Sequence, residues 1–183
     1  KYHEKYVPFT VPKNLRNWLK DSLSEGKLQD GGFLYRGSLT KGAVDKRTIQ
    51  LYLNFDEAEL RYHPEWPRLS DIDAFLTVDD LEVDATVASA KLYESQVEET
   101  MVHAAPNPAG KGFLLYVNAA LTGDASDGLK VLRESPIRNA IGSSLDSWAL
   151  AGEMNIGLSL TVPLVAGEPG MRQNVVVDLY ATR

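Results

Sequence analysis

The sequence predicts a mainly β fold with some α structure (α+β), in which consecutive antiparallel strands form a meander. We expect this sheet to curve into a groove or a partly open barrel. Apolar residues alternate with mostly polar ones over residues 71–78 and again over 81–88, the pattern of half-buried strands. Other alternating stretches follow with short turns between them, which favours pairing of sequence neighbours. No Gly-rich loop joins a strand to a helix, so a doubly wound nucleotide-binding fold is disfavoured.

Length and composition are those of one folded domain, and we expect a single domain over residues 1–183. The chain is 44% hydrophobic and 24% charged, which allows a sizeable core. Its net charge of −6 disfavours nucleic acid and anionic membrane surfaces as partners. It has no cysteine, which excludes disulfides and thiolate metal sites. Because it starts at Lys1 and ends on the strand-like run VVVDLYATR, we expect an excised segment of a longer protein.

Strands are expected wherever apolar residues recur with a period of two, with Gly, Pro and polar residues between the runs. Asp79-Asp80 is the predicted turn between two of them, and residues 59–62 are predicted as a short separate strand. The predicted strands and extended stretches are 28–39, 49–55, 59–62, 69–78, 81–92, 93–105, 113–121, 154–162 and 175–179.

Two helical elements are predicted, over residues 13–25 and 126–149. Pro12 suits the first turn of a helix, apolar residues follow at helical spacing, and Gly26 is the expected stop. In the second element Ser126 or Asp127 is the expected N-cap, and Pro136 breaks the helix.

The alternating strands place many apolar residues on one face, some of them small, including Ala74, Ala85, Ala119 and Gly157. Periodicity alone does not distinguish a face that helices cover as a core from a face that lines an apolar channel. Both interpretations stay open at this point. The candidate lining residues are Ile72, Ala74, Leu76, Val78, Leu81, Val83, Ala85, Val87, Leu115, Val117, Ile156, Leu158 and Leu160.

Histidines and serines give little support for an enzyme. His3, His63 and His103 are far apart, and none has the spacing of a metal-ligand pair. Ser143-Ser144 does not lie in a G-x-S-x-G motif after a strand, so we interpret it as a turn or a cap.

Carboxylates supply the remaining catalytic candidates. Asp79-Asp80 falls at a predicted turn, where Asp is favoured for backbone reasons, and Asp71 and Asp73 fall on a solvated face. We therefore predict no catalytic residue, no metal ligand and no cofactor. A carboxylate-based hydrolase is the weakest hypothesis and requires two of these groups to converge in one pocket.

Several longer motifs resemble one protein family. They are NLRNWLKDSLSEGKL, GGFLYRGSL, YHPEWPRL (62–69), LRESPI and WALAGEMNIGLSLTVPL (148–164). Together they resemble the central region of the YhdP proteins, members of the AsmA-like group related to TamB. The resemblance covers most of residues 12–165.

This resemblance implies a non-enzymatic segment of a long periplasmic protein, anchored in the inner membrane of Gram-negative bacteria by one helix. Such proteins are thought to form an apolar β-groove along which phospholipid tails move towards the outer membrane. The implied partners are phospholipid acyl chains and neighbouring segments of the same parent chain, and the excised segment is expected to pair edge to edge as a homodimer. The alternative is a structural β module or scaffold of a large envelope protein, with a fully packed core.

Overall fold

The computed structural model describes residues 20–38, 47–135, 138–139, 142–164 and 176–182, and for 176–182 it describes the backbone alone. These residues form a nine-stranded sheet in the order β1-β2-β3-β4-β5-β7-β8-β9, with β6 paired to β4 and β7. The strands are β1 (Lys27–Gly37), β2 (Arg47–Leu60), β3 (Leu69–Asp79), β4 (Glu82–Leu92), β5 (Ser95–Val97), β6 (Thr100–Pro106), β7 (Phe113–Asp124), β8 (Glu153–Leu164) and β9 (Val176–Thr182).

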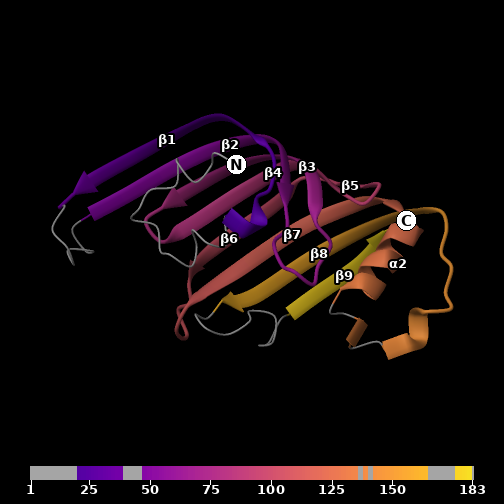
Figure 1. The fold of residues 1–183 in the computed structure, drawn as a ribbon. Coiled ribbons are helices and arrows are strands. Elements are labelled where there is room, and N and C mark those ends of the chain that lie inside the picture. Colours follow the sequence, from indigo (N-terminus) through magenta and orange to yellow (C-terminus); the bar gives the residue numbers. More distant parts are fainter. Residues whose placement is uncertain (1–19, 39–46, 136–137, 140–141, 165–175, 183) are drawn as a thin grey trace.

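Every strand pair is antiparallel, so the predicted β-rich meander is confirmed. The sheet curves without closing, because β1 and β9 lie at its two ends and are not paired with each other (Figure 1). Helix α2 (Ala125–Glu134) lies across one end of the strands, and the short 3₁₀ helix η3 (Gly142–Leu145) follows it.

The prediction of a separate strand over residues 59–62 is wrong, because β2 runs on to Leu60 through two irregular positions. Its register with β3 shifts between Phe55 and Ala58 and again before Leu60, and Glu57 has a φ of 52°. Asp71 of β3 has a φ of 49° in the matching region. Bulges increase local twist and bend a sheet, so these positions curve β2 and β3 without interrupting them.

Asp73 bridges the bulged region through both oxygens of its carboxylate. Its Oδ1 accepts a hydrogen bond from the Glu57 N–H at 3.2 Å, and its Oδ2 accepts one from the Ser89 hydroxyl at 3.2 Å. These bonds, first of all the one from the Glu57 backbone, lower the pKa of Asp73. The charged side chain therefore holds β2, β3 and β4 together where they bend.

The turn between β3 and β4 lies one residue later than predicted. Asp79 pairs with Glu82, so the two turn residues are Asp80 and Leu81. Asp80 has a φ of 50°, a conformation that Asp tolerates, and its Oδ1 accepts a hydrogen bond from the Ile49 N–H at 2.7 Å. Leu81 is thus a turn residue with 57% of its surface exposed, and not the first residue of a strand.

The second predicted helical element, 126–149, is present as α2, two helical residues at 138–139 and η3, but it starts one residue earlier than predicted and its last helical residue is Leu145. Asp124 caps α2 by accepting a hydrogen bond from the Ser126 N–H at 2.7 Å, so Ser126 and Asp127 are not the cap. The helix ends at Glu134, and Ser135 is extended, as the residue before a proline prefers.

The first predicted helix, 13–25, lies mostly outside the described residues. Residues 20–22 are helical, but Leu23 already pairs with Leu60, so the predicted end at residue 25 is wrong. Gly26 therefore has another role. Its φ is 129°, and a Cβ there would lie 2.8 Å from the Ala58 Cα, so only glycine allows the chain to pass this close to β2.

The core is small and lies at one end of the sheet. Ala58, Ile72, Ala90 and Val97 form one buried cluster, with Phe55, Leu60, Leu69, Ala74, Val87, Leu92 and Leu121 packed against it. Leu129 of α2 is also buried. A Cβ on Gly128 would lie 2.6 Å from the Met154 Cε, so the helix backbone approaches β8 closely here.

Candidate functional site: the apolar inner face

Strand register lines up apolar residues from β1 to β8 on one face of the sheet, because directly paired residues project to the same side. We call two adjacent rows on the part of this face away from α2 the apolar strip. Its first row is Phe33, Leu51, Val78, Val83, Ala104, Leu115 and Val162, and its second row is Gly31, Leu53, Leu76, Ala85, Val102, Val117 and Leu160.

The predicted lining residues divide into four groups. The strip contains Leu76, Val78, Val83, Ala85, Leu115, Val117 and Leu160. Ala74, Val87 and Leu158 lie on the same face one row further along. Ile72 lies in the buried core cluster, and Ile156 lies beside Gly128 of α2. Leu81 lies in the β3–β4 turn, as described above.

Residues of β1, β2 and β6, together with Val162 of β8, complete the strip and are not among the predicted lining residues. The alternation of Leu51 and Leu53 with polar neighbours is a usable signal for β2. The prediction that Gly157 lies on the inner face is wrong. It pairs with Ala120 and alternates with Ile156 and Leu158, which places it on the opposite side of the sheet.

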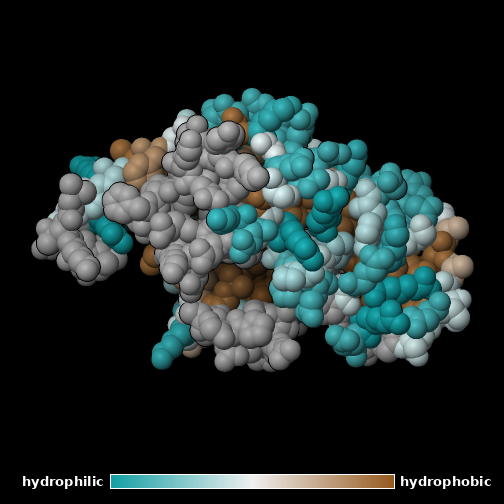
Figure 2. Space-filling view, in the orientation of Figure 1, coloured by the Kyte–Doolittle hydropathy of each residue, from teal (hydrophilic) through white to brown (hydrophobic). Residues whose placement is uncertain are grey.

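The strip remains partly exposed. Apart from Val162, its β2, β3, β4, β6, β7 and β8 residues are all only half-buried. Across the described part of the chain, only six hydrophobic residues are fully buried. Figure 2 shows apolar surface in a hollow over β7 and β8. A sheet face packed under a complete second layer would have a row of fully buried residues, so the strip is an accessible apolar surface.

The opposite end of the inner face is covered by α2, and a buried carboxylate fixes the helix there. Asp127 is 5% exposed, and its Oδ2 accepts hydrogen bonds from the Ser95 hydroxyl at 2.7 Å and the Glu94 N–H at 3.1 Å. Ser95 has no exposed surface. We call this region, Ala58, Ile72, Ala90, Val97 and α2, the packed end.

Tyr93 adds a second attachment for α2. Its hydroxyl donates to the Glu134 carboxylate at 2.6 Å, and the Lys130 ammonium lies 4.4 Å from the centre of its ring. Burial, together with the hydrogen bond to Glu134, raises the pKa of Tyr93. Both ends of the helix are thus tied to the β4–β5 connection.

Arg133 holds the segment after α2. Its guanidinium donates to the carbonyl oxygens of Leu145, Asp146 and Trp148 at 2.6 to 3.1 Å. Carbonyls at the end of a helical turn lack intrahelical partners, and a cation is favourable there. The fork of Arg133 therefore fixes η3 and the chain that leads to β8.

The YHPEWPRL motif forms the β2–β3 loop and lies in front of the strands in Figure 1. The rings of Tyr62 and Trp66 are 6.2 Å apart, and the Trp66 N–H donates to the His63 carbonyl at 3.2 Å. Burial raises the pKa of Tyr62 to about 12. The motif is therefore a packed turn of the fold.

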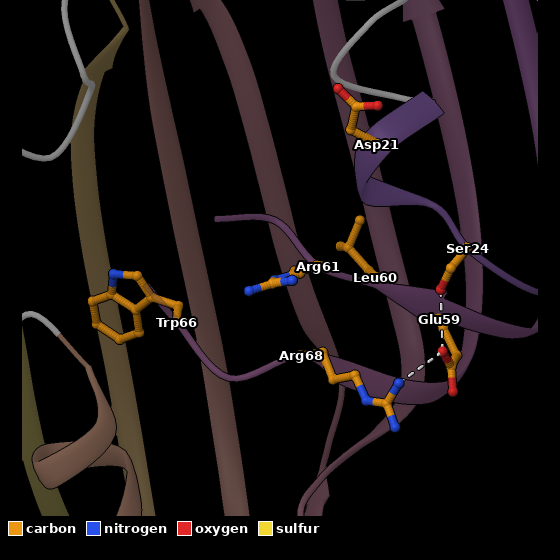
Figure 3. Close-up of a pocket in the computed structure, with 7 residues that line it drawn as sticks. All are labelled: Asp21, Ser24, Glu59, Leu60, Arg61, Trp66 and Arg68. Atoms are coloured by element: carbon orange, nitrogen blue, oxygen red, sulfur yellow. Dashed lines mark hydrogen bonds and ion pairs between the residues drawn. The ribbon is translucent and has the colours of Figure 1, made fainter. Parts of the chain in front are cut away.

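An open pocket of about 450 Å³ lies beside this loop, lined by Asp21, Ser24, Glu59, Leu60, Arg61, Trp66 and Arg68. Figure 3 shows Arg61 and Trp66 on one side, and the linked Ser24, Glu59 and Arg68 side chains on the other. Because the two arginines do not point to a common centre, the pocket has no focused binding geometry.

The carboxylates considered for catalysis have separate roles in the fold. Asp71 pairs with Lys91 at 2.8 Å, and Asp79 accepts a hydrogen bond from the Gln50 amide at 3.3 Å. Asp73 bridges the bulge and Asp80 holds the turn. The structure does not bring these four groups together in a pocket.

The histidines and serines are equally dispersed. His103 pairs with Asp84 at 2.7 Å, the His63 ring accepts a hydrogen bond from the Glu65 N–H, and His3 lies outside the described residues. Ser143 and Ser144 are exposed in η3. The described residues contain no group of three or more side chains suited to a metal ion.

Fold and site define a class of protein: an open, curved antiparallel sheet whose inner face is packed at one end and accessible and apolar at the other. Among the described residues, no helix has the length and apolar character needed to cross a membrane.

The family model for the YhdP protein matches residues 1–180, and the chain belongs to the YhdP family. This is a family of envelope proteins connected with lipid transport. No curated protein and no solved structure matches the chain significantly.

Proposed function

We propose that this chain is a periplasmic segment of an inner-membrane-anchored YhdP protein and that its apolar strip holds phospholipid acyl chains in transit between the inner and outer membranes. The observation that carries the proposal is the continuous, partly exposed strip across β1 to β8. In this role the chain catalyses no reaction.

The chemistry of the strip suits a passing lipid. Each buried CH₂ of an acyl chain gains about 0.8 kcal/mol, and aliphatic side chains bind it without fixing one position. The seven strands that contribute to the strip lie about 4.8 Å apart and span roughly 29 Å, which compares with the roughly 30 Å hydrocarbon core of a bilayer. A surface of this size accommodates acyl chains in many overlapping positions, as movement along it requires.

The edges of the sheet suit a segment within a longer groove. β1 and β9 each have one side without a partner strand in the described part of the chain, and such edges readily pair with another strand. We propose that neighbouring segments of the parent protein continue the sheet there. The separated chain then forms edge-to-edge homodimers.

Lipid retention by the purified chain tests the proposal. The chain is expressed in a Gram-negative host, purified without detergent, and its bound phospholipid is measured by native mass spectrometry. The double variant Leu76→Gln/Val117→Gln makes the second row of the strip polar, and we expect it to lose most of the bound phospholipid. The control Tyr52→Gln changes a residue 43% exposed on the other face, and its retention should match that of the wild type.

Two results would contradict the proposal. If the wild-type chain carries no phospholipid at all, the strip is no lipid surface. If the strip variant and the Tyr52→Gln control lose lipid equally, binding does not depend on the inner face. Either result favours the alternative of a structural module, whose packed end would then be its main feature.

A further inference from the structure

Arg47 is a cation on the apolar inner face. It pairs with Gly37 of β1 and lies two residues before Ile49 and four before Leu51 in β2, which places it on the same face as the strip. It lies at the end of β2 opposite the packed end, and it is half-buried. Along this face β2 therefore presents one positive charge, followed by apolar residues up to the core.

Of the described arginines, Arg36 and Arg47 have no hydrogen-bond or ion-pair partner among the described residues, and of these two only Arg47 is half-buried. Among the residues that the structure describes, none forms an ion pair or hydrogen bond with the Arg47 guanidinium. Arg133, which is also half-buried, donates to three carbonyls. The acid across the hairpin, Asp80, accepts a hydrogen bond from the Ile49 backbone.

A guanidinium has five donors in a fixed fork that matches the oxygens of a phosphate. Partial burial removes some of the water that would otherwise satisfy these donors, so an anionic ligand gains more here than at an exposed arginine. Tyr35, the partner of Ile49, lies at the same boundary and donates its hydroxyl to the Ser38 carbonyl. Tyrosine and arginine next to an apolar surface are the residues that favour the interface between hydrocarbon and headgroups.

The spacing fits a phospholipid. From Arg47 to Leu53 there are six residues, or about 20 Å at roughly 3.4 Å per residue. One leaflet of a bilayer, headgroup included, is also about 20 Å thick. A lipid with its phosphate at Arg47 and its chains along β2 would reach the second row of the strip, and the packed end begins a few residues beyond.

We infer that Arg47 binds the phosphate of a lipid headgroup and so orients each phospholipid, with its headgroup at the Arg47 end of β2 and its tails towards the packed end. This inference rests on the proposed function of the strip. It adds a polar contact that selects phospholipids over neutral lipids.

The test compares a phospholipid with a lipid that has no phosphate. Dioleoyl phosphatidylglycerol and dioleoylglycerol are offered separately to the delipidated chain, and bound lipid is measured by native mass spectrometry. We expect Arg47→Gln to reduce retention of phosphatidylglycerol about tenfold and to leave that of dioleoylglycerol unchanged. The matched control is Arg36→Gln, an exposed arginine near the same end of the neighbouring strand, which should change neither value.

The possible outcomes distinguish a failure of the Arg47 inference from a failure of the proposed lipid-binding function of the strip. If the wild type binds neither lipid, the proposed function fails. If the wild type and Arg47→Gln bind each of the two lipids equally well, the strip binds lipid but Arg47 does not bind the phosphate. If excess inorganic phosphate displaces phosphatidylglycerol, the site binds phosphate without regard to the lipid, and the orienting role is wrong.

Discussion

The two ends of the inner face have the same residue types and different surroundings. At the packed end, Ala58, Ile72 and Val97 are each less than 9% exposed, and partly buried apolar residues such as Phe55 and Leu121 pack against them. At the strip, residues of the same strands with the same alternation stay half-buried. The difference lies in what covers them. Gly26 lies close to Ala58, and α2 lies close to Met154 and Ile156, where Asp127 and Tyr93 tie it to the β4–β5 connection.

This contrast separates stability from function within one sheet. A residue at the packed end contributes dispersion and burial on all sides, whereas a strip residue makes contacts mainly with its neighbours in the sheet. Substitutions at the packed end should therefore affect folding, and substitutions in the strip should affect what the surface binds.

The largest expected effect compares two positions on one face of β3. Ile72→Ala, at 5% exposure, removes buried methyl groups and should lower the free energy of unfolding by about 3 kcal/mol. Leu76→Ala, in the half-exposed strip, should cost about 1 kcal/mol. Urea titration followed by tryptophan fluorescence measures both. Equal losses would mean that the strip is as well packed as the core.

Asp127→Ala tests the attachment of α2. The change leaves the buried Ser95 hydroxyl and the Glu94 N–H without their acceptor, and we expect a loss of about 2 kcal/mol. Asp84→Ala is the matched change on the outer face, where it removes only an exposed pair with His103, and it should cost less than about 0.5 kcal/mol. If the two variants unfold at the same urea concentration, Asp127 does not hold the helix.

Arg133→Lys keeps the charge but loses the planar fork. Lysine cannot reproduce the simultaneous bonds to three carbonyls, so η3 and its flanking chain should loosen, at a cost of about 1 kcal/mol. Hydrogen exchange should rise over residues 142–148 and stay unchanged in β2 and β3. A rise spread over the whole sheet would contradict this local role.

The smallest effect concerns pH and the bulge. The pKa of Asp73 is lowered in the folded state, so its contribution to stability is present above the unfolded pKa of about 3.9 and is lost as the pH falls through the lower folded value. Between pH 5 and pH 2.5 the wild type should therefore lose more stability than Asp73→Asn. Urea midpoints at several pH values measure this, and parallel curves would show that Asp73 is not the responsible group.

Much of the sheet could be predicted because alternation depends only on which residues are apolar. The pairing of Ala74 with Val87 and of Leu76 with Ala85 follows from that pattern once the turn is placed. The predicted turn, Asp79-Asp80, lies one residue before the observed turn, because Asp79 and Asp80 are both suitable turn residues. The bulges at Glu57 and Asp71 carry no local signal, because neither residue is a glycine.

Coverage of the inner face could not be predicted, because it depends on contacts between distant segments. Asp127 looked like a helix cap, and only the folded chain brings it to Ser95, 32 residues away in sequence. Glycine at position 128 gave no indication that α2 would lie against Met154. The apolar composition of a sheet face can thus be predicted from the sequence, whereas the exposure of that face depends on tertiary packing.

The order of the strands has a consequence for biosynthesis. β2, β3, β4, β7, β8 and β9 each pair with a strand that precedes them in the chain, and β5 and β6 find partners within the same short region. Such local pairing keeps the entropy of loop closure low. The sheet can therefore grow one strand at a time from its N-terminal side as the chain emerges, and each new strand covers the edge left by the one before.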